Sequence, residues 1–141
     1  MRLSDARSSI GDLVASAAVV VFAFSVVAVP HPAQARDPDG SRLKANEQQL
    51  GSSHDDTINP PEDRADWRYV QIKEAATVRF SLDTRPEETT ATLRITRATG
   101  EELDSVKTSE GRATVERQLE PGLYYLEVTA HSQISYTLHI E

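Results

Sequence analysis

Apolar and polar residues alternate along the second half of the chain, in short runs separated by turn-forming residues. In the run Ala76–Leu82, Val78, Phe80 and Leu82 share one parity, and polar residues occupy the positions between them. Successive side chains of a β-strand point to opposite faces, so such a run predicts a strand with one buried face. Similar alternation is found in residues 67–72, 89–96, 112–119, 123–129 and 135–140, and residues 103–106 are expected to form a further short strand after the turn Ala98-Thr99-Gly100-Glu101.

The most informative of these runs follows Pro121-Gly122, a pair typical of a turn. The whole pattern amounts to about seven short strands at roughly ten-residue spacing, which is typical of an antiparallel β-sandwich or barrel. Alternate polar positions indicate that each sheet has one face in water. We expect Trp67, Phe80 and Tyr124 to lie in the core.

The N-terminal part has a different pattern. Residues 13–29 are almost entirely apolar, and Ala33-Gln34-Ala35 has the small-x-small form of a signal-peptidase site. These features predict a signal peptide, residues 1–35, cleaved after Ala35, and therefore a secreted or periplasmic protein. The alternative is an uncleaved membrane anchor, and a membrane enters as a partner only in that case.

Residues 36–57 are polar and rich in turn pairs, so they predict a flexible tether. Within it, Lys44–Leu50 fits a helical turn or a first edge strand equally well. The folded domain is expected over residues 58–141.

Charge and composition exclude several classes of function. The net charge is −7 and the pI is about 5.1, with no cluster of basic residues, which argues against nucleic acid as a partner. Cysteine is absent, which excludes disulfides and thiolate metal sites.

Several motifs together resemble the bacterial pre-peptidase C-terminal domain, a secreted, jelly-roll-like β-sandwich usually appended to extracellular peptidases. The resemblance covers residues 55–141. It depends on Ile58-Asn59-Pro60-Pro61, Asp66-Trp67, Val78-Arg79-Phe80, Leu93-Arg94-Ile95, Thr99-Gly100, the segment Leu119-Glu120-Pro121-Gly122-Leu123-Tyr124-Tyr125-Leu126-Glu127-Val128, and Tyr136-Thr137-Leu138. Within these 141 residues we expect no peptidase domain, and Arg97 or Ala98 stands where the family usually places an Asp before Thr-Gly.

Relatives in bacterial collagenases look like collagen-binding modules that use surface tyrosines and bind calcium through acidic residues near the first core strand. Only Asp63 and Asp66 match that loop here. Calcium takes six to eight oxygen ligands, and acidic loops supply them. The resemblance therefore implies calcium as a possible cofactor, whereas a simpler interpretation is that the two residues cap and solubilise a turn.

No pattern in the sequence predicts catalysis. The four histidines have no metal-type spacing, and no Gly-x-Ser-x-Gly elbow is present. We therefore expect a protein that is not an enzyme.

Two outward tyrosines point to binding instead. Tyr125 is outward by parity, and Tyr69 joins it if their strands are neighbours. Tyrosine is favoured in interfaces, although a cross-strand pair that only stiffens the sheet remains an alternative. The sequence thus predicts a binding module for a protein or polysaccharide, or alternatively an accessory that stabilises a separately encoded secreted enzyme.

Overall fold

The computed structural model describes residues 39–141, which fold almost entirely into strands. The predicted signal peptide and its cleavage site lie outside the described residues. None of the helical segments in the described part is long or apolar enough to cross a membrane. The elements are a 3-10 turn, η1 (Arg42–Lys44), and the strands β1 (Asn46–Glu47), β2 (Ser52–Ile58), β3 (Ala65–Ile72), β4 (Ala76–Arg85), β5 (Ala91–Arg97), β6 (Glu102–Lys107), β7 (Arg112–Leu119), β8 (Gly122–Ala130) and β9 (Ile134–Ile140).

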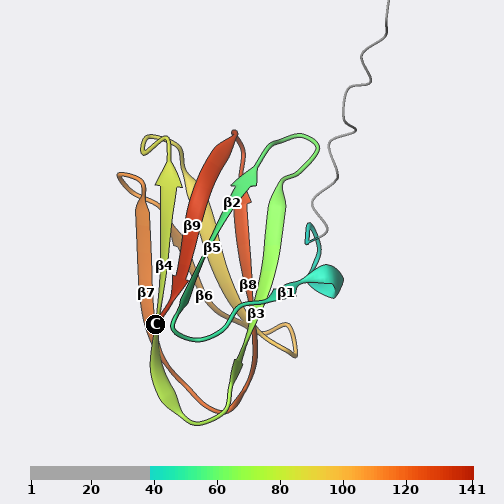
Figure 1. The fold of residues 1–141 in the computed structure, drawn as a ribbon, viewed down its shortest axis with the longest axis vertical. Coiled ribbons are helices and arrows are strands. Elements are labelled where there is room, and N and C mark those ends of the chain that lie inside the picture. The colour runs from blue at the N-terminus through green and yellow to red at the C-terminus, as the bar shows by residue number, and fades with distance from the viewer. Residues whose placement is uncertain (1–38) are drawn as a thin grey trace, which may run out of the picture. The chain divides into compact units, whose positions relative to one another are not determined.

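The strands form two sheets that pack face to face (Figure 1). Sheet A has the order β1-β3-β8-β5-β6, and sheet B has the order β2-β9-β4-β7. Apart from the parallel pair of β1 and β3, every pairing is antiparallel. From β2 onward these are eight strands in two four-stranded sheets, with consecutive strands usually in opposite sheets. This arrangement is a jelly roll and confirms the predicted fold class.

The core lies between the sheets and follows the predicted parity. Phe80, Leu93, Leu126 and Leu138 are completely buried, and Tyr124 is nearly so. The chain bends at Pro121, and Gly122, expected in the turn, already belongs to β8 and pairs with Ile72. The Tyr124 hydroxyl donates to the Glu120 carbonyl at 2.8 Å, which satisfies the buried end of this side chain. The seven strands expected after residue 58 are β3 to β9.

The folded domain begins earlier than the sequence predicts. Residues 52–57, expected in the flexible tether, belong to β2 and pair with β9 along its whole length. Within Lys44–Leu50 the structure has the edge strand β1, whereas η1 lies before the segment and shares only Lys44 with it. The inward positions of β2 include His54 and Asp56, so the strand lacks the apolar alternation by which strands are found.

The expected place of Trp67 is wrong. Val70 and Ile72 point into the core, so Trp67, at the opposite parity of β3, lies on the outer face of sheet A and is half-buried. Its inward neighbours are the buried polar residues Asp66 and Arg68. The first half of β3 therefore places polar side chains inside and aromatic ones outside.

Candidate functional site

The two predicted binding tyrosines are direct neighbours on the outer face of sheet A. β3 and β8 are adjacent and antiparallel, and Tyr69 pairs with Tyr125 in register. The ring centroids are 6.1 Å apart and the ring planes are tilted by 53°. Both side chains are half-buried. The two strands are neighbours, which is the condition for a joint binding surface of the two tyrosines. The same geometry is also expected of a cross-strand pair that only stiffens the sheet.

The N-terminal segment borders this pair. The guanidinium of Arg42 lies 4.3 Å from the centroid of the Tyr125 ring. Next to it, the Leu43 side chain is 100% exposed. A shallow depression of about 490 Å³ lies between this segment and the sheet, lined by Arg42, Leu43, Ala45, Tyr69, Ala98 and Tyr125.

Trp67 extends the aromatic surface along β3. It is two residues from Tyr69 on the same face, so the two side chains are about 7 Å apart along the strand. Arg94 lies 5.9 Å from the Trp67 ring and pairs with Glu127. We call Trp67, Tyr69 and Tyr125 the aromatic face.

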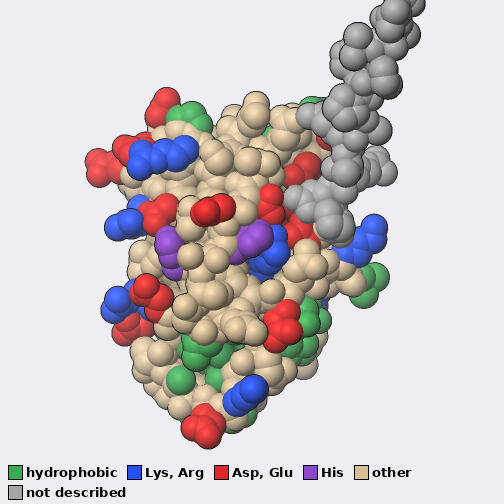
Figure 2. All heavy atoms as spheres, in the orientation of Figure 1, with side chains coloured by type: hydrophobic (Ala, Val, Ile, Leu, Met, Phe, Trp, Pro, Cys, Tyr) green, Lys and Arg blue, Asp and Glu red, His purple; other side chains and the backbone are tan. Residues whose placement is uncertain are grey.

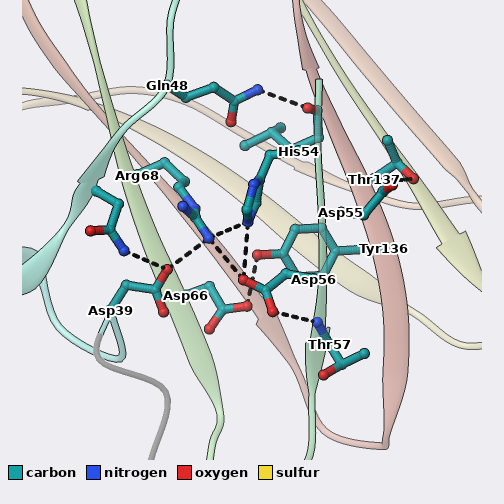
Figure 3. Close-up of polar contacts among 12 residues, drawn as sticks. Asp39, Gln48, His54, Asp55, Asp56, Thr57, Asp66, Arg68, Tyr136 and Thr137 are labelled. Atoms are coloured by element: carbon teal, nitrogen blue, oxygen red, sulfur yellow. Dashed lines mark hydrogen bonds and ion pairs between the residues drawn. The ribbon is translucent and has the colours of Figure 1, made fainter. Parts of the chain in front are cut away.

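Asp66, one of the predicted calcium ligands, points into the molecule. Its side chain is 0% exposed, and its Oδ2 accepts a hydrogen bond of 2.7 Å from the Tyr136 hydroxyl (Figure 3). Its Oδ1 is buried without a hydrogen-bond partner among the described residues. Burial raises the pKa of Asp66 to about 8, with smaller contributions from the charges of Asp63, Asp39 and Asp56. The carboxyl is therefore protonated at neutral pH.

The buried Arg68 joins two separate segments near Asp66. Its Nη2 lies 2.9 Å from Asp39 Oδ2 and 2.8 Å from Asp56 Oδ2, and it also contacts His54 (Figure 3). Asp39 belongs to the N-terminal segment, whereas Asp56 and His54 belong to β2. We call Asp39, His54, Asp56, Asp66, Arg68 and Tyr136 the buried polar cluster.

The geometry around Asp66 does not resemble an open calcium loop. Asp63 is half-buried in the segment between β2 and β3, and its amide donates to the Asn59 carbonyl at 3.3 Å. Among residues 39–141, no group of three or more acidic, histidine or cysteine side chains is arranged to hold a metal ion. The two residues predicted as ligands are near enough for Asp63 to raise the pKa of Asp66.

The remaining histidines of the described part do not form a catalytic arrangement. His139 is on the outer face of sheet B, as its parity predicts, with Nε2 3.3 Å from Asp83 Oδ2. Ser81 is its register neighbour, but the Ser81 hydroxyl lies 3.4 Å from that of Thr114. His131 follows β8 and is exposed. No serine hydroxyl in this part of the chain forms a hydrogen bond with a histidine nitrogen that would activate it.

Sheet B presents a different surface from sheet A. Figure 2 views the side on which β4 and β9 lie in front. The backbone and side chains that are neither charged nor hydrophobic dominate there, with charged groups scattered among them. A hollow of about 1090 Å³ at one end is lined by carboxylates, hydroxyls and two arginines. Its ion pairs are internal, such as Arg112 Nε with Asp83 Oδ1 at 2.5 Å, which lowers the pKa of Asp83. In the described part of the chain, the outer face of sheet B has no counterpart of the aromatic face on sheet A.

Arg42 could not be assigned to the site from the sequence pattern, whereas the position of Arg68 in its strand carries a signal. Arg42 acts on residues about 55 positions later in the chain, and no local pattern announces such a contact. Arg68 stands at an inward position between Asp66 and Val70, and this parity is a signal that a buried charge is present.

Comparison with known proteins supports the fold. No protein-family model matches the sequence, and no curated protein matches it. Among solved structures, the pre-peptidase C-terminal domain of collagenase from Bacillus anthracis superposes with a TM-score of 0.63 at 16% identity, over 69% of this chain and 94% of that one.

Two further structures are less similar. CorA, described as a surface-associated copper-binding protein of Methylomicrobium album BG8, has a TM-score of 0.48 at 9% identity, over 69% of this chain and 98% of that one. PliG of Aeromonas hydrophila, a periplasmic inhibitor of g-type lysozyme, has a TM-score of 0.39 at 8% identity, over 69% and 99%. The collagenase match alone is close enough to compare architectures, and it shows that the described domain has the fold of a pre-peptidase C-terminal domain.

Proposed function

We propose that the protein is an exported, non-catalytic binding module that recognises a protein or polysaccharide through its aromatic face. One observation carries this proposal: Tyr69 and Tyr125, on strands more than 50 residues apart in sequence, are paired in register on an outer sheet face. Trp67 and the depression beside Arg42 enlarge the same surface. Aromatic residues and arginine are the types that contribute most to binding interfaces.

The location of the protein is part of the proposal. The apolar segment and Ala33-Gln34-Ala35 support export to the periplasm or the cell exterior. A fold shared with a domain of a bacterial collagenase agrees with such a location.

The test separates binding from folding. Tyr69→Ser with Tyr125→Ser is compared with Tyr69→Phe with Tyr125→Phe, which keeps both rings. Each protein is assayed by thermal melting, by capture of partners from envelope or matrix extracts, and by sedimentation with insoluble polysaccharides. The proposal requires the serine variant to lose its ligand while melting cooperatively and the phenylalanine variant to keep it. If the serine variant loses stability alone, the pair only stiffens the sheet.

The second proposal is an accessory role for a separately encoded secreted enzyme. The fold that the domain shares with the pre-peptidase C-terminal domain of a bacterial collagenase supports this role. Co-purification of a peptidase with the tagged protein, together with a longer half-life of that peptidase at elevated temperature, would support it. An enzyme that is equally stable with and without the protein would reject it.

A further inference from the structure

The end of the aromatic face that includes Tyr125 already contains a cation in a built cradle. The Arg42 guanidinium lies over the Tyr125 ring and donates through Nη2 to two carbonyls, of Arg97 at 3.1 Å and of Ala98. Arg97 is the last residue of β5 and Ala98 begins the turn to β6, which the Gly100 amide closes by donating to Arg97 O at 2.9 Å. The cradle is therefore held by two hydrogen-bonded segments of sheet A.

Gly100 leaves room for the guanidinium. Its φ of 94° lies in the region that favours glycine. A Cβ added there would lie 3.4 Å from Arg42 Nη1, at the limit of ordinary contact. The turn thus approaches the arginine with bare backbone.

The groups that face Arg42 suit a guanidinium in particular. An arginine has five N–H donors in a plane and no acceptor, and the cradle offers two carbonyl acceptors and the π face of a tyrosine. Guanidinium groups stack on aromatic rings and are less strongly hydrated than ammonium groups. A neutral hydroxyl ligand would use one of these features, whereas an arginine uses all of them.

The segment that carries Arg42 is held against the domain by residues before and after Arg42 in the chain. Asp39 is held by Arg68, and its carbonyl accepts from the Trp67 amide at 3.0 Å. Gln48 is buried and donates to Leu138 O at 2.9 Å. Between them, η1 has no buried residue and its N-cap Ser41 makes no side-chain cap. The Arg42 side chain can therefore leave the cradle while the contacts of Asp39 and Gln48 stay in place.

We infer that this cradle is an arginine-recognition site, occupied by Arg42 in the free protein and by an arginine of a protein partner in the complex. The inference rests on the proposed function and specifies its partner as a protein with an accessible arginine. The charge of the domain fits such a partner: the three basic and three acidic residues of segment 1–38 cancel, so the described part carries the full −7. An acidic protein attracts a basic partner over long distances.

The direct experiment empties the cradle and offers it a probe. N-acetyl-arginine amide is titrated into Arg42→Ala, and the ring signals of Tyr125 are followed by NMR. N-acetyl-citrulline amide, which has the same shape without the charge, is the ligand control. Arg79→Ala, which removes an exposed arginine of sheet B, is the protein control. We expect a saturable shift with the arginine probe in Arg42→Ala, at least about fivefold weaker binding in the wild type, where Arg42 competes, and the same weak binding in Arg79→Ala.

Two further variants decide the mechanism. Tyr125→Leu in the Arg42→Ala background should abolish the saturable shift of the neighbouring backbone amides, and Arg42→Lys should bind the probe more tightly than the wild type. The inference is overturned if Arg42→Ala gives no saturable shift, or if citrulline amide binds as well as arginine amide. In those cases the proposed function is still judged separately by Tyr69→Ser alone, which removes one ring of the aromatic face and leaves the Tyr125 ring and the two carbonyls of the cradle in place.

Discussion

In the first half of β3 the two faces have opposite chemistry, although their residues alternate along one strand. On the inner face, Asp66 and Arg68 are buried among other polar groups, and on the outer face Trp67 and Tyr69 are half-exposed aromatic residues. The usual pattern of a half-exposed strand is the reverse. The two faces therefore have separate roles. The inner polar side chains connect the N-terminal segment and β2 to β3. The outer aromatic side chains contribute little to the core and are available for contacts with a partner.

The inner face is costly to maintain, because charges out of water must be compensated. Arg68 compensates two carboxylates from different segments, and Tyr136 satisfies one oxygen of Asp66. The outer face carries no such requirement. Substitutions on the two faces should therefore differ in size and in what they affect.

The largest effect is expected at Arg68. Arg68→Ala removes the partner of both Asp39 and Asp56 and should lower the free energy of unfolding by about 3–5 kcal/mol, as the loss of one member of a buried ion pair does. Urea denaturation measures this change. Arg79→Ala, which breaks the exposed pair with Glu116, should cost no more than about 1 kcal/mol. Equal costs for the two variants would contradict the account, because Arg68 is buried on the inner face of β3 whereas Arg79 is exposed on the outer face of sheet B.

The next effect is a pH dependence set by Asp66. Its pKa is raised from 3.8 to about 8 on folding, so the folded state holds this proton more tightly than the unfolded state. Its contribution to stability is complete below the unfolded pKa and is lost as pH rises towards the folded pKa. We expect the wild-type Tm to fall as pH rises from the unfolded value of 3.8 towards about 8, and Asp66→Asn to flatten this fall.

Asp83 provides the control for that experiment. Its pKa is lowered by Arg112, so its contribution to stability is present above its unfolded pKa and is lost in acid. Asp83→Asn should leave the slope near neutral pH unchanged and alter the profile only at low pH. A parallel slope in wild type and Asp66→Asn would show that another group is responsible.

A smaller effect is expected for the tyrosine pair itself. In a double-mutant cycle with Tyr69→Ser and Tyr125→Ser, the coupling free energy should be about 0.5–1 kcal/mol, the usual contribution of an exposed cross-strand aromatic pair. Thermal and urea unfolding of the four proteins measure it. A coupling free energy several times larger would show that the pair serves mainly to stabilise the fold and would argue against a role in binding.

The smallest effect is expected from calcium. Asp66 is buried and protonated at neutral pH, so we expect added calcium to leave the Tm unchanged. A rise in Tm that Asp66→Asn abolishes would instead establish the calcium site that the family resemblance implies.

The sequence predicted the parts of the fold that depend on apolar alternation. Phe80, Leu93, Leu126 and Leu138 occupy the core positions that their parity predicts, and the neighbouring strands of Tyr69 and Tyr125 fulfil the stated condition for a joint surface. The expectation that Trp67 lies in the core is wrong, because Val70 and Ile72 occupy the inward positions of β3 and Trp67 has the opposite parity.

The remaining features could not be predicted because they depend on contacts between distant polar residues. β2 is polar up to its last residue, Ile58, since His54 and Asp56 point towards Arg68 rather than towards apolar side chains. Arg42 reaches Tyr125 and the turn at Arg97 across the sheet, and no periodicity encodes such a contact. Polar networks of this kind have no one-dimensional pattern, whereas apolar faces do.

The most direct test of the account measures ligand capture and Tm on the same protein samples. The samples are the Tyr69→Ser, Tyr125→Ser double variant and Arg68→Ala, and Arg68→Ala is kept at a temperature below its unfolding transition. The account predicts that the outer-face variant loses its ligand with a Tm close to that of the wild type, whereas the inner-face variant binds the ligand with a greatly lowered Tm. Retention of the ligand by the outer-face variant would contradict the account.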